Sequence, residues 1–300
     1  MNIIKLTELK DICNDIIHPP ACDYVAMNNR YGHAYHLKKY ARIDTDSFLN
    51  CPIEHGLNIE NDSVISFEVS QNCSKIITFS NYRKDIIEKY TDLNAITVGP
   101  YIAYADSYYD DDLLNEIKSK LKRTLLVFPS HNAEIESNSF DYDIFIKSIK
   151  ELSKEFDSVV ICLYYLDVKE EIVHLYKQNG FSIVTAGAGD DIRFLSRLKS
   201  IILLADAVAG NDFTTGLAYS LYLDKPIYMI RQTIVCDGHN RVNTSLMNLD
   251  LRYLNELYVL ASDPKFGRLN EQKNWANYMF GLDCVKSVDE MHALLKPMIR

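Results

Sequence analysis

A group of amide, carboxylate, hydroxyl and glycine residues separates two short apolar runs in the last third of the chain. The group comprises Asn211, Asp212, Thr214, Thr215 and Gly216. The apolar run 205–210 precedes it, a helical pattern over 217–223 follows, and a second apolar run, 227–230, comes next. This order predicts strand, turn, helix and strand, the unit that connects two parallel strands. The polar group then lies at a helix N-terminus, where free N–H groups and the helix dipole attract anions.

This stretch is therefore interpreted as a phosphate-binding site. The role is assigned to Asn211, Thr214, Thr215 and Gly216. Under the alternative interpretation, the residues from Asn211 to Thr215 merely cap a helix, as such residues do in many proteins. Ser130 and His131 follow another apolar run, 124–128, and are predicted to join the same site. In that position His131 could donate a hydrogen bond to a phosphate oxygen and stabilise a leaving nucleotide.

A second candidate for chemistry is the sequence Glu54-His55-Gly56, which follows the apolar run 49–53. The pKa of an imidazole lies near the working pH, so a histidine at a strand end can take the proton from an acceptor hydroxyl. We predict that His55 is a general base. Glu54 is an alternative base, or it orients His55. The structural alternative is that His55 only fills a turn.

Three further positions are weaker candidates. His33 follows Tyr31-Gly32 and precedes a predicted helix, and Arg83 follows the predicted strand 75–79. Both could contact an acceptor or a phosphate, or both could lie on the surface. Gly187 and Gly189 could wrap a nucleobase or ribose, because glycines permit close approach of the backbone. The alternative for these glycines is an ordinary loop.

Composition and charge limit the class of protein. The formal net charge is −9 and no long basic stripe offsets it, which argues against a nucleic-acid partner. Seven widely separated cysteines without a CxxC pair argue against a disulfide framework or zinc site and favour a reducing compartment. No signal-peptide pattern and no apolar run approaching 18 residues occur. The sequence predicts a cytoplasmic, soluble protein.

The second half of the chain alternates regularly between strand and helix patterns. Strands are predicted at 124–128, 158–164, 181–185, 205–210 and 227–230, and helices at 142–156, 168–179, 192–198 and 217–223. Such alternation predicts a parallel sheet with helices on both faces, a Rossmann-like domain. In such a sheet, ligands collect at the carboxyl ends of the strands, which is where the candidate residues fall.

The first half predicts a smaller domain of the same type. Its expected strands are 23–27, 49–53, 64–69, 75–79 and 95–98, and its expected helices are 34–41 and 84–90. Residues 3–17 have helical spacing. After Arg231 the pattern weakens, with a strand or helix at 254–260, a helix at 271–282 and a capped helix from Ser287 to 295. The predicted domains are 1–120, 121–270 and a C-terminal helical segment, 271–300, that crosses back to the first domain.

Several motifs together resemble a known family. They are Tyr31-Gly32-His33, Ile53-Glu54-His55-Gly56, Thr78-Phe79-Ser80, Val98-Gly99-Pro100-Tyr101, Phe128-Pro129-Ser130-His131, 194–200 and 211–226. Over roughly residues 22–290, their order resembles bacterial glycosyltransferases of the GT-B fold that build capsule and lipopolysaccharide. The chain departs from the expected pattern at Asn132 and at Phe213-Thr214. The resemblance implies two Rossmann-like domains, parallel sheets covered by helices on both faces and C-terminal helices that pack back.

The resemblance also implies a function. The expected reaction moves a sugar from a CMP- or UDP-linked donor to a growing glycan or a lipid-linked acceptor, at the inner face of the cytoplasmic membrane. No cofactor and no metal are expected, because the acidic run 110–112 is not placed like a DxD metal site. The basic residues that follow it are read as a solvated face or as a contact for anionic lipid. The alternatives are a sugar-nucleotide epimerase, a CDP-glycerol-type polyol-phosphate transferase, and a non-catalytic nucleotide-binding subunit.

Overall fold

The computed structural model describes residues 6–19, 26–56, 73–132, 137–237, 241–242 and 251–300. The chain divides into two compact units that are interleaved along the sequence. Unit 1 contains Met1–Asp15, Ser107–Ala188 and Arg197–Gln272, and unit 2 contains Ile16–Asp106, Gly189–Ser196 and Lys273–Arg300. The contiguous ranges 1–120 and 121–270 expected from the sequence do not reproduce this interleaving. Periodicity locates helices and strands, but it does not reveal which body a short segment joins.

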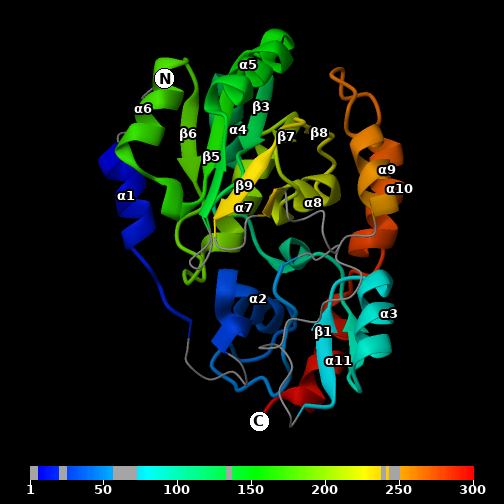
Figure 1. The fold of residues 1–300 in the computed structure, drawn as a ribbon. Helices are drawn as coiled ribbons and strands as arrows, with labels where there is room; N and C mark the ends of the chain where they lie inside the picture. The colour runs from blue at the N-terminus through cyan, green and yellow to red at the C-terminus, as the bar shows by residue number, and fades with distance from the viewer. Residues whose placement is uncertain (1–5, 20–25, 57–72, 133–136, 238–240, 243–250) are drawn as a thin grey trace. The chain divides into compact units, whose positions relative to one another are not determined.

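Unit 1 is built on a five-stranded parallel sheet. The strands are β3 (Thr124–Phe128), β5 (Ser158–Leu163), β6 (Ser182–Thr185), β7 (Ala207–Gly210) and β8 (Ile227–Met229). Their spatial order is β6-β5-β3-β7-β8, and every pair is parallel. Every residue of β3 and β7 is buried, because helices cover a parallel sheet on both faces. The predicted α/β fold with a parallel sheet between helices is confirmed, and Figure 1 shows these strands side by side.

The helices of unit 1 cover both faces of this sheet. They are α1 (Leu6–Asn14), α4 (Asp111–Leu121), α5 (Tyr142–Leu152), α6 (Glu170–Gln178), most of α7 (Phe194–Leu203), α8 (Thr215–Tyr222) and α9 (Leu251–Leu260), with 3-10 turns at Ser153–Glu155 and Tyr165–Asp167. Leu125 and Val127 of β3 pack with Phe145 and Ile149 of α5 in one core. Leu126, which points to the other face because side chains alternate along a strand, lines a cavity beside α4 and α7.

One element of unit 1 was not predicted. Strands β4 (Ser137–Phe140), β9 (Ile234–Asp237) and β10 (Arg241–Val242) form an antiparallel sheet in the order β10-β9-β4. Strand β4 is polar, and β9, with the sequence Ile-Val-Cys-Asp, does not alternate between apolar and polar residues, so periodicity gave no strand signal. The segment expected as a strand or helix at 254–260 is the helix α9.

Unit 2 contains a shorter parallel pairing. Its elements are η1 (Ala26–Gly32), α2 (His33–Tyr40), β1 (Lys75–Thr78), α3 (Asn81–Tyr90), β2 (Asn94–Thr97), η2 (Tyr101–Tyr104), most of α10 (Leu269–Phe280), α11 (Val288–Leu295) and η6 (Lys296–Met298). Strands β1 and β2 pair in parallel, and Ile53 forms a parallel bridge to Ile77. The expected strand 49–53 thus appears only as bridges at its two ends. The expected strands 23–27 and 64–69 lie wholly or mostly outside the described residues.

Two terminal features follow from local sequence. Ser287 caps α11 in a capping box with Glu290, as the spacing of these two residues predicts. Helix α1 covers the centre of the helical pattern at 3–17 and belongs to unit 1. Within the described part of the chain, no helix has both the length and the apolar content needed to cross a bilayer.

Candidate functional site

The predicted phosphate residues meet at one place in unit 1. The chain runs from β3 to β5 and β6 on one side, then returns to add β7 and β8 on the other. The loops after β3 and β7 therefore diverge at a topological switch point, where open α/β sheets bind ligands. The backbone N–H of Ser130 donates to Asn211 Oδ1 at 2.7 Å, and the Ser130 hydroxyl donates to Asp212 Oδ2 at 3.0 Å. The two loops are thus fixed to each other across the crevice.

The N-terminus of α8 opens at the same switch point. Thr214 is the N-cap residue, and its side chain makes no capping hydrogen bond. Among the described residues, its buried Oγ1 has no hydrogen-bond partner. Thr215 begins the helix, and a Cβ at Gly216 would lie 3.2 Å from the Phe128 ring, so a glycine lets α8 pack against the end of β3. This arrangement places a buried hydroxyl without a described partner at a helix N-terminus, an end that attracts anions.

Of the residues in the capping alternative, Thr214 holds the N-cap position of α8, whereas Asn211 and Asp212 do not cap it. Asn211 binds Ser130 and also donates from Nδ2 to Gln232 Oε1 at 3.1 Å. Asp212 accepts from the backbone N–H of Phe213 at 2.9 Å. Both residues organise the loop before the helix, because the helix begins two to three residues further along the chain than a cap at either position requires.

His131 lies at the same edge of the sheet. Its ring centroid is 4.6 Å from that of Tyr164, and its Nδ1 lies 3.0 Å from the carbonyl oxygen of Asn132. A carbonyl only accepts, so Nδ1 carries hydrogen in this contact and Nε2 accepts in the neutral ring. His131 therefore donates to a phosphate from Nε2 only when both ring nitrogens carry hydrogen.

A small polar pocket adjoins Ser130 and His131. Its volume is about 10 Å³, close to the space of one water molecule, and Asp167 and Tyr176 also line it. Asp167 accepts from the backbone N–H of Asn132 at 3.1 Å and from the Asn132 amide group. Burial raises the pKa of Tyr176, so its hydroxyl stays protonated. Asn132, a departure from the expected family pattern, thus anchors the loop after β3.

Gly187 and Gly189 each lie against a neighbouring side chain that leaves no room for a Cβ, and the two glycines belong to different units. Gly187 has a φ of +90°, and a Cβ there would lie 2.8 Å from Arg197 Nη1. A Cβ at Gly189 would lie 2.8 Å from Arg30 Nε and 2.9 Å from the Tyr31 ring. Each glycine thus admits an arginine side chain. This differs from the expected contact with a nucleobase or ribose, which stays a prediction.

In unit 2, Glu54 is part of a sealed ion pair. Arg83 is fully buried, and Glu54 is 1% exposed. Glu54 Oε1 accepts from Arg83 Nε at 2.8 Å and from Nη2 at 2.5 Å, while Oε2 accepts from the Thr78 hydroxyl at 2.5 Å. The Tyr101 hydroxyl donates to the backbone carbonyl of Glu54 at 2.9 Å. Arg83 positions Glu54 here, a role different from the phosphate contact expected from the sequence.

His55 follows this ion pair and is partly exposed. The Tyr31 ring stacks on it at a centroid distance of 5.2 Å, and the His33 ring lies 6.2 Å away. His33 is buried against Tyr101, with centroids 4.6 Å apart. Burial, followed by the charges of His55 and His36, lowers the pKa of His33 well below its usual value. His33 is therefore held neutral, and His55 is the histidine of this group that reaches the surface.

Tyr31 was not singled out from the sequence, although it orders this site. Tyr31 has a φ of 58° and Gly32 a φ of 75°, two successive left-handed residues that turn the chain into α2. The Tyr31 N–H donates to the Gly189 carbonyl at 2.6 Å, and its ring lies 4.5 Å from that of Phe194. The motif Tyr31-Gly32-His33 contained this signal, because an aromatic residue before glycine and histidine can brace a neighbouring ring.

The charged groups near the acidic run are mostly paired. Lys118 contacts Asp206 at 2.5 Å, and Lys120 contacts Glu116 at 2.5 Å. In the run itself, Asp110 caps α4 and accepts from the Leu113 N–H. Within the ranges that the structure describes, no group of three or more His, Cys, Asp or Glu residues could hold a metal ion.

No family model matches this sequence, and no curated protein matches it either. Among solved structures, the chain is similar to the wall teichoic acid polymerase TagF, with 12% identity over 85% of this chain and 68% of that chain and a TM-score of 0.46. It is similar to S. aureus MnaA, solved with UDP, with 12% identity over 81% of this chain and 66% of that chain and a TM-score of 0.43.

A glycosyltransferase from Rickettsia africae is similar at 13% identity over 91% of this chain and 80% of its own, with a TM-score of 0.38. TM-scores below 0.5 at such identities do not assign the chain to a family, so its function has to be argued from its own residues. Those residues form an α/β protein in which a parallel sheet, flanked by helices, gathers polar side chains at its topological switch point.

Proposed function

We propose that this protein transfers a sugar from a nucleotide-sugar donor to a hydroxyl group of a bacterial surface glycan. The observation that carries the proposal is the N-terminus of α8 at the switch point of unit 1. There the buried Oγ1 of Thr214 has no hydrogen-bond partner among the described residues, and Ser130 and His131 lie on the adjoining loop. A buried hydroxyl costs stability unless it is bonded, and a phosphate oxygen at this position can accept from it.

The donor phosphate is assigned to this end of α8. The N–H groups of Thr215 and Gly216, the hydroxyls of Thr214 and Thr215, and imidazolium His131 would hydrogen-bond the phosphate oxygens. These interactions strengthen when the bond between the anomeric carbon and the phosphate oxygen breaks, because negative charge then grows on the leaving nucleotide. Fixed donors of this kind can stabilise the leaving group without a cation, so we propose transfer that is independent of metal.

Proton removal is assigned to His55 of unit 2. As the acceptor oxygen bonds to the anomeric carbon, its proton passes to a neutral imidazole nitrogen of His55. Glu54 is the weaker candidate for the base, because Arg83 and Thr78 already occupy its carboxylate oxygens. We assign Glu54 and Arg83 to positioning: they fix the backbone that presents His55. His33, buried and neutral, packs beneath His55 and is assigned to the acceptor side of the site.

The proposal extends to the substrates of the protein and to its location in the cell. We propose a CMP- or UDP-linked donor, an acceptor that is a capsule or lipopolysaccharide glycan or its lipid-linked precursor, and action in the cytoplasm at the inner face of the membrane. The basic residues of α4 support this last point only weakly, because Lys118 and Lys120 are engaged with carboxylates.

Product analysis tests the reaction class. The purified full chain is incubated with UDP- and CMP-sugars, with and without an acceptor glycan, after a thermal-shift panel of CMP, CDP, UDP and GDP has identified the nucleotide that binds. A ligand that binds only the folded state raises the melting temperature. Sugar attached to glycan with release of free nucleotide supports transfer. An altered sugar nucleotide formed without acceptor supports an epimerase, and transfer of polyol phosphate from added CDP-glycerol supports a polyol-phosphate transferase. Nucleotide binding without turnover of any substrate supports a non-catalytic subunit.

A further inference from the structure

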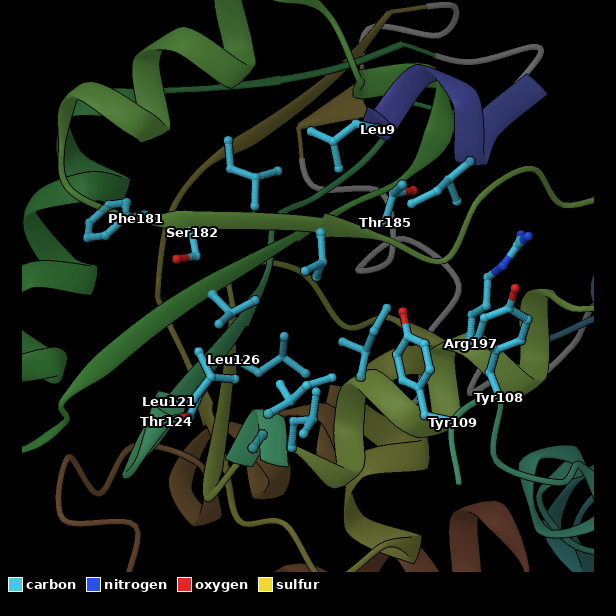
Figure 2. A pocket seen from close by; sticks show the side chains of 18 of the residues that line it. Leu9, Tyr108, Tyr109, Leu121, Thr124, Leu126, Phe181, Ser182, Thr185 and Arg197 are labelled. Carbon is cyan, nitrogen blue, oxygen red and sulfur yellow. The ribbon is translucent and has the colours of Figure 1, made fainter. Parts of the chain in front are cut away.

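Unit 1 contains a large cavity that the proposed reaction does not use. Its volume is about 730 Å³, within the usual range for sites that bind small molecules. It lies on the sheet face opposite the α5 core, between α1, α4, α7 and the strands β3, β5 and β6 (Figure 2). The switch-point residues Ser130, Asn211 and Thr214 are not among its lining residues.

The cavity wall is largely apolar. The apolar lining includes Leu9, Ile12, Leu121, Leu126, Val160 and Ile201. An apolar cavity of this volume loses the dispersion contacts and the water exclusion that a filled core provides, so a protein keeps it open at a cost. A hydrocarbon chain would restore those contacts, at a gain of about 0.8 kcal/mol for each CH₂ group buried.

One end of the cavity carries polar and charged side chains. Arg197 lies there beside Tyr108 and Tyr109, at the opposite end from Phe181 (Figure 2). Arg197 is 7% exposed, its guanidinium carbon lies 5.2 Å from the centroid of the Tyr108 ring, and its Nη1 lies 3.4 Å from the Ala186 carbonyl oxygen. The other charged lining residues are partly or fully exposed at the rim: Asp11, Asp15, Lys120 and Lys177. Arg197 is therefore the buried charged residue of the lining.

Neighbouring residues hold this end in place. The Ser200 hydroxyl accepts from the backbone N–H groups of Tyr108 at 2.8 Å and of Tyr109 at 3.2 Å, which ties both tyrosines to α7. Burial raises the pKa of Tyr109, so its hydroxyl remains a donor at neutral pH. Gly187 leaves space for the guanidinium, because a Cβ there would lie 2.8 Å from Arg197 Nη1. The glycine expected at a nucleotide thus serves to seat an arginine.

From this juxtaposition we infer that the cavity binds a single-chain amphiphile with an anionic head group. The hydrocarbon chain lies along the aliphatic wall, and the head group accepts hydrogen bonds from Arg197 and Tyr109. A planar guanidinium pairs well with carboxylate or phosphate oxygens, so both head groups fit the chemistry. The inference does not depend on sugar transfer, since the cavity is separate from the switch-point site.

Displacement of cis-parinaric acid, a fluorescent fatty acid, from the purified full chain tests the inference. Straight-chain carboxylates should displace it with about fourfold tighter binding for each added CH₂ group, until the chain fills the cavity and the gain stops. Hexadecanol, which has a chain and no charge, should compete more weakly than palmitate. Farnesyl phosphate is a further competitor: displacement stronger than that by palmitate identifies a phosphate head group, and weaker displacement identifies a carboxylate.

Two variants locate the binding. Arg197→Gln should weaken palmitate binding by about 10- to 100-fold, the loss expected for hydrogen bonds to a charged group, and should leave hexadecanol unchanged. Ser182→Phe fills space at the Phe181 end and should shorten the chain length at which the gain stops. Ser139→Phe, at an exposed strand position of β4, is the matched control and should change nothing. Melting curves establish that each variant is folded.

Three results would overturn the inference. They are failure of the wild-type chain to bind cis-parinaric acid, equal effects of Ser182→Phe and Ser139→Phe, and an unchanged ratio of palmitate to hexadecanol affinity in folded Arg197→Gln. Either of the first two results would mean that the cavity does not hold the hydrocarbon chain. The third would mean that Arg197 does not bind the head group. Loss of nucleotide binding at the switch point would leave all three readouts unaffected. A failure of the proposed function can therefore be told apart from a failure of this inference.

Discussion

The two units place polar groups after strands in contrasting ways. In unit 2, the carboxylate of Glu54 is enclosed by Arg83 and Thr78, and the ion pair is almost completely buried. In unit 1, Ser130 and Asn211 bond to each other, while Thr214 keeps a buried hydroxyl without a partner among the described residues. Because buried polar groups are nearly always bonded, we infer that the satisfied network acts as a scaffold and that the unbonded hydroxyl marks the proposed phosphate site.

The largest expected effect concerns the residue presented by the scaffold. His55→Ala should lower turnover about 10²- to 10⁴-fold, the usual contribution of positioned proton transfer. Nucleotide affinity should barely change, since the donor is assigned to unit 1. Initial rates and calorimetric affinities measure the two quantities separately.

The Glu54→Gln variant is the companion to that experiment. A larger loss of turnover in folded Glu54→Gln than in His55→Ala would move the base to Glu54. Near-normal turnover in both variants would remove this strand end from the mechanism and leave the Glu54–Arg83 pair with a structural role alone.

The next prediction tests whether the buried network of Glu54, Arg83 and Thr78 stabilises the fold of unit 2. Arg83→Met leaves the Glu54 carboxylate buried and uncompensated, so the free energy of unfolding should fall by about 3–5 kcal/mol. Lys120→Met breaks the exposed pair with Glu116 and should lower the free energy of unfolding far less, because solvent screens exposed pairs. Urea unfolding of both variants gives the comparison. Equal, small losses would mean that Arg83 is dispensable to the fold.

A smaller effect is expected from pH. Burial lowers the pKa of His33 below the value of about 6.5 that it has in the unfolded chain. The stability from neutral His33 is therefore fully present above pH 6.5 and is lost as the pH falls toward the folded pKa, by up to about 1.4 kcal/mol for each pH unit. Unfolding of wild type and His33→Gln at pH 7.5 and 5.5 isolates this contribution. An equal loss of stability in both proteins would contradict it.

The smallest expected effect is that of a chelator. If N–H groups, hydroxyls and imidazolium stabilise the leaving phosphate, excess EDTA should leave turnover within about twofold of the untreated rate. Turnover that collapses and is restored by magnesium or manganese would show that the proposed phosphate site in unit 1 is completed by a cation.

Sequence reasoning predicted the architecture of unit 1 well. The apolar run 124–128 coincides with β3, and the unit from 205 to 230 has the strand, helix and strand that its pattern indicates. Buried parallel strands and short crossovers have strong local signals, which is why their order could be predicted. The antiparallel strands β4 and β9 have no such pattern, since β4 alternates between exposed and half-buried residues.

The site was predicted in its parts, and its connections were missed. Ser130, Asn211 and Thr214 do come together, because parallel strands end at one edge of the sheet. The link between Glu54 and Arg83 spans 29 residues and depends on β1 pairing near Ile53, which no local pattern reveals. Arg83 consequently has a different place from the one expected, and the roles of Gly187 and Gly189 depend on arginines distant in sequence.

The central claim is that the N-terminus of α8 binds the donor phosphate. Titration calorimetry with the best-binding nucleotide tests it in wild type and in the double variant Thr214→Ala/Thr215→Ala. The fold should persist, because Thr214 makes no side-chain capping bond. Ser287→Ala, which removes a true cap from α11, is the control: it should lower stability by about 1 kcal/mol and leave nucleotide affinity unchanged.

If the N-terminus of α8 binds the donor phosphate, the double variant should bind nucleotide about 1–3 kcal/mol more weakly, roughly 5- to 150-fold, with unchanged stoichiometry. Wild-type affinity in the folded double variant, or a wild-type chain that binds no nucleotide, would contradict it.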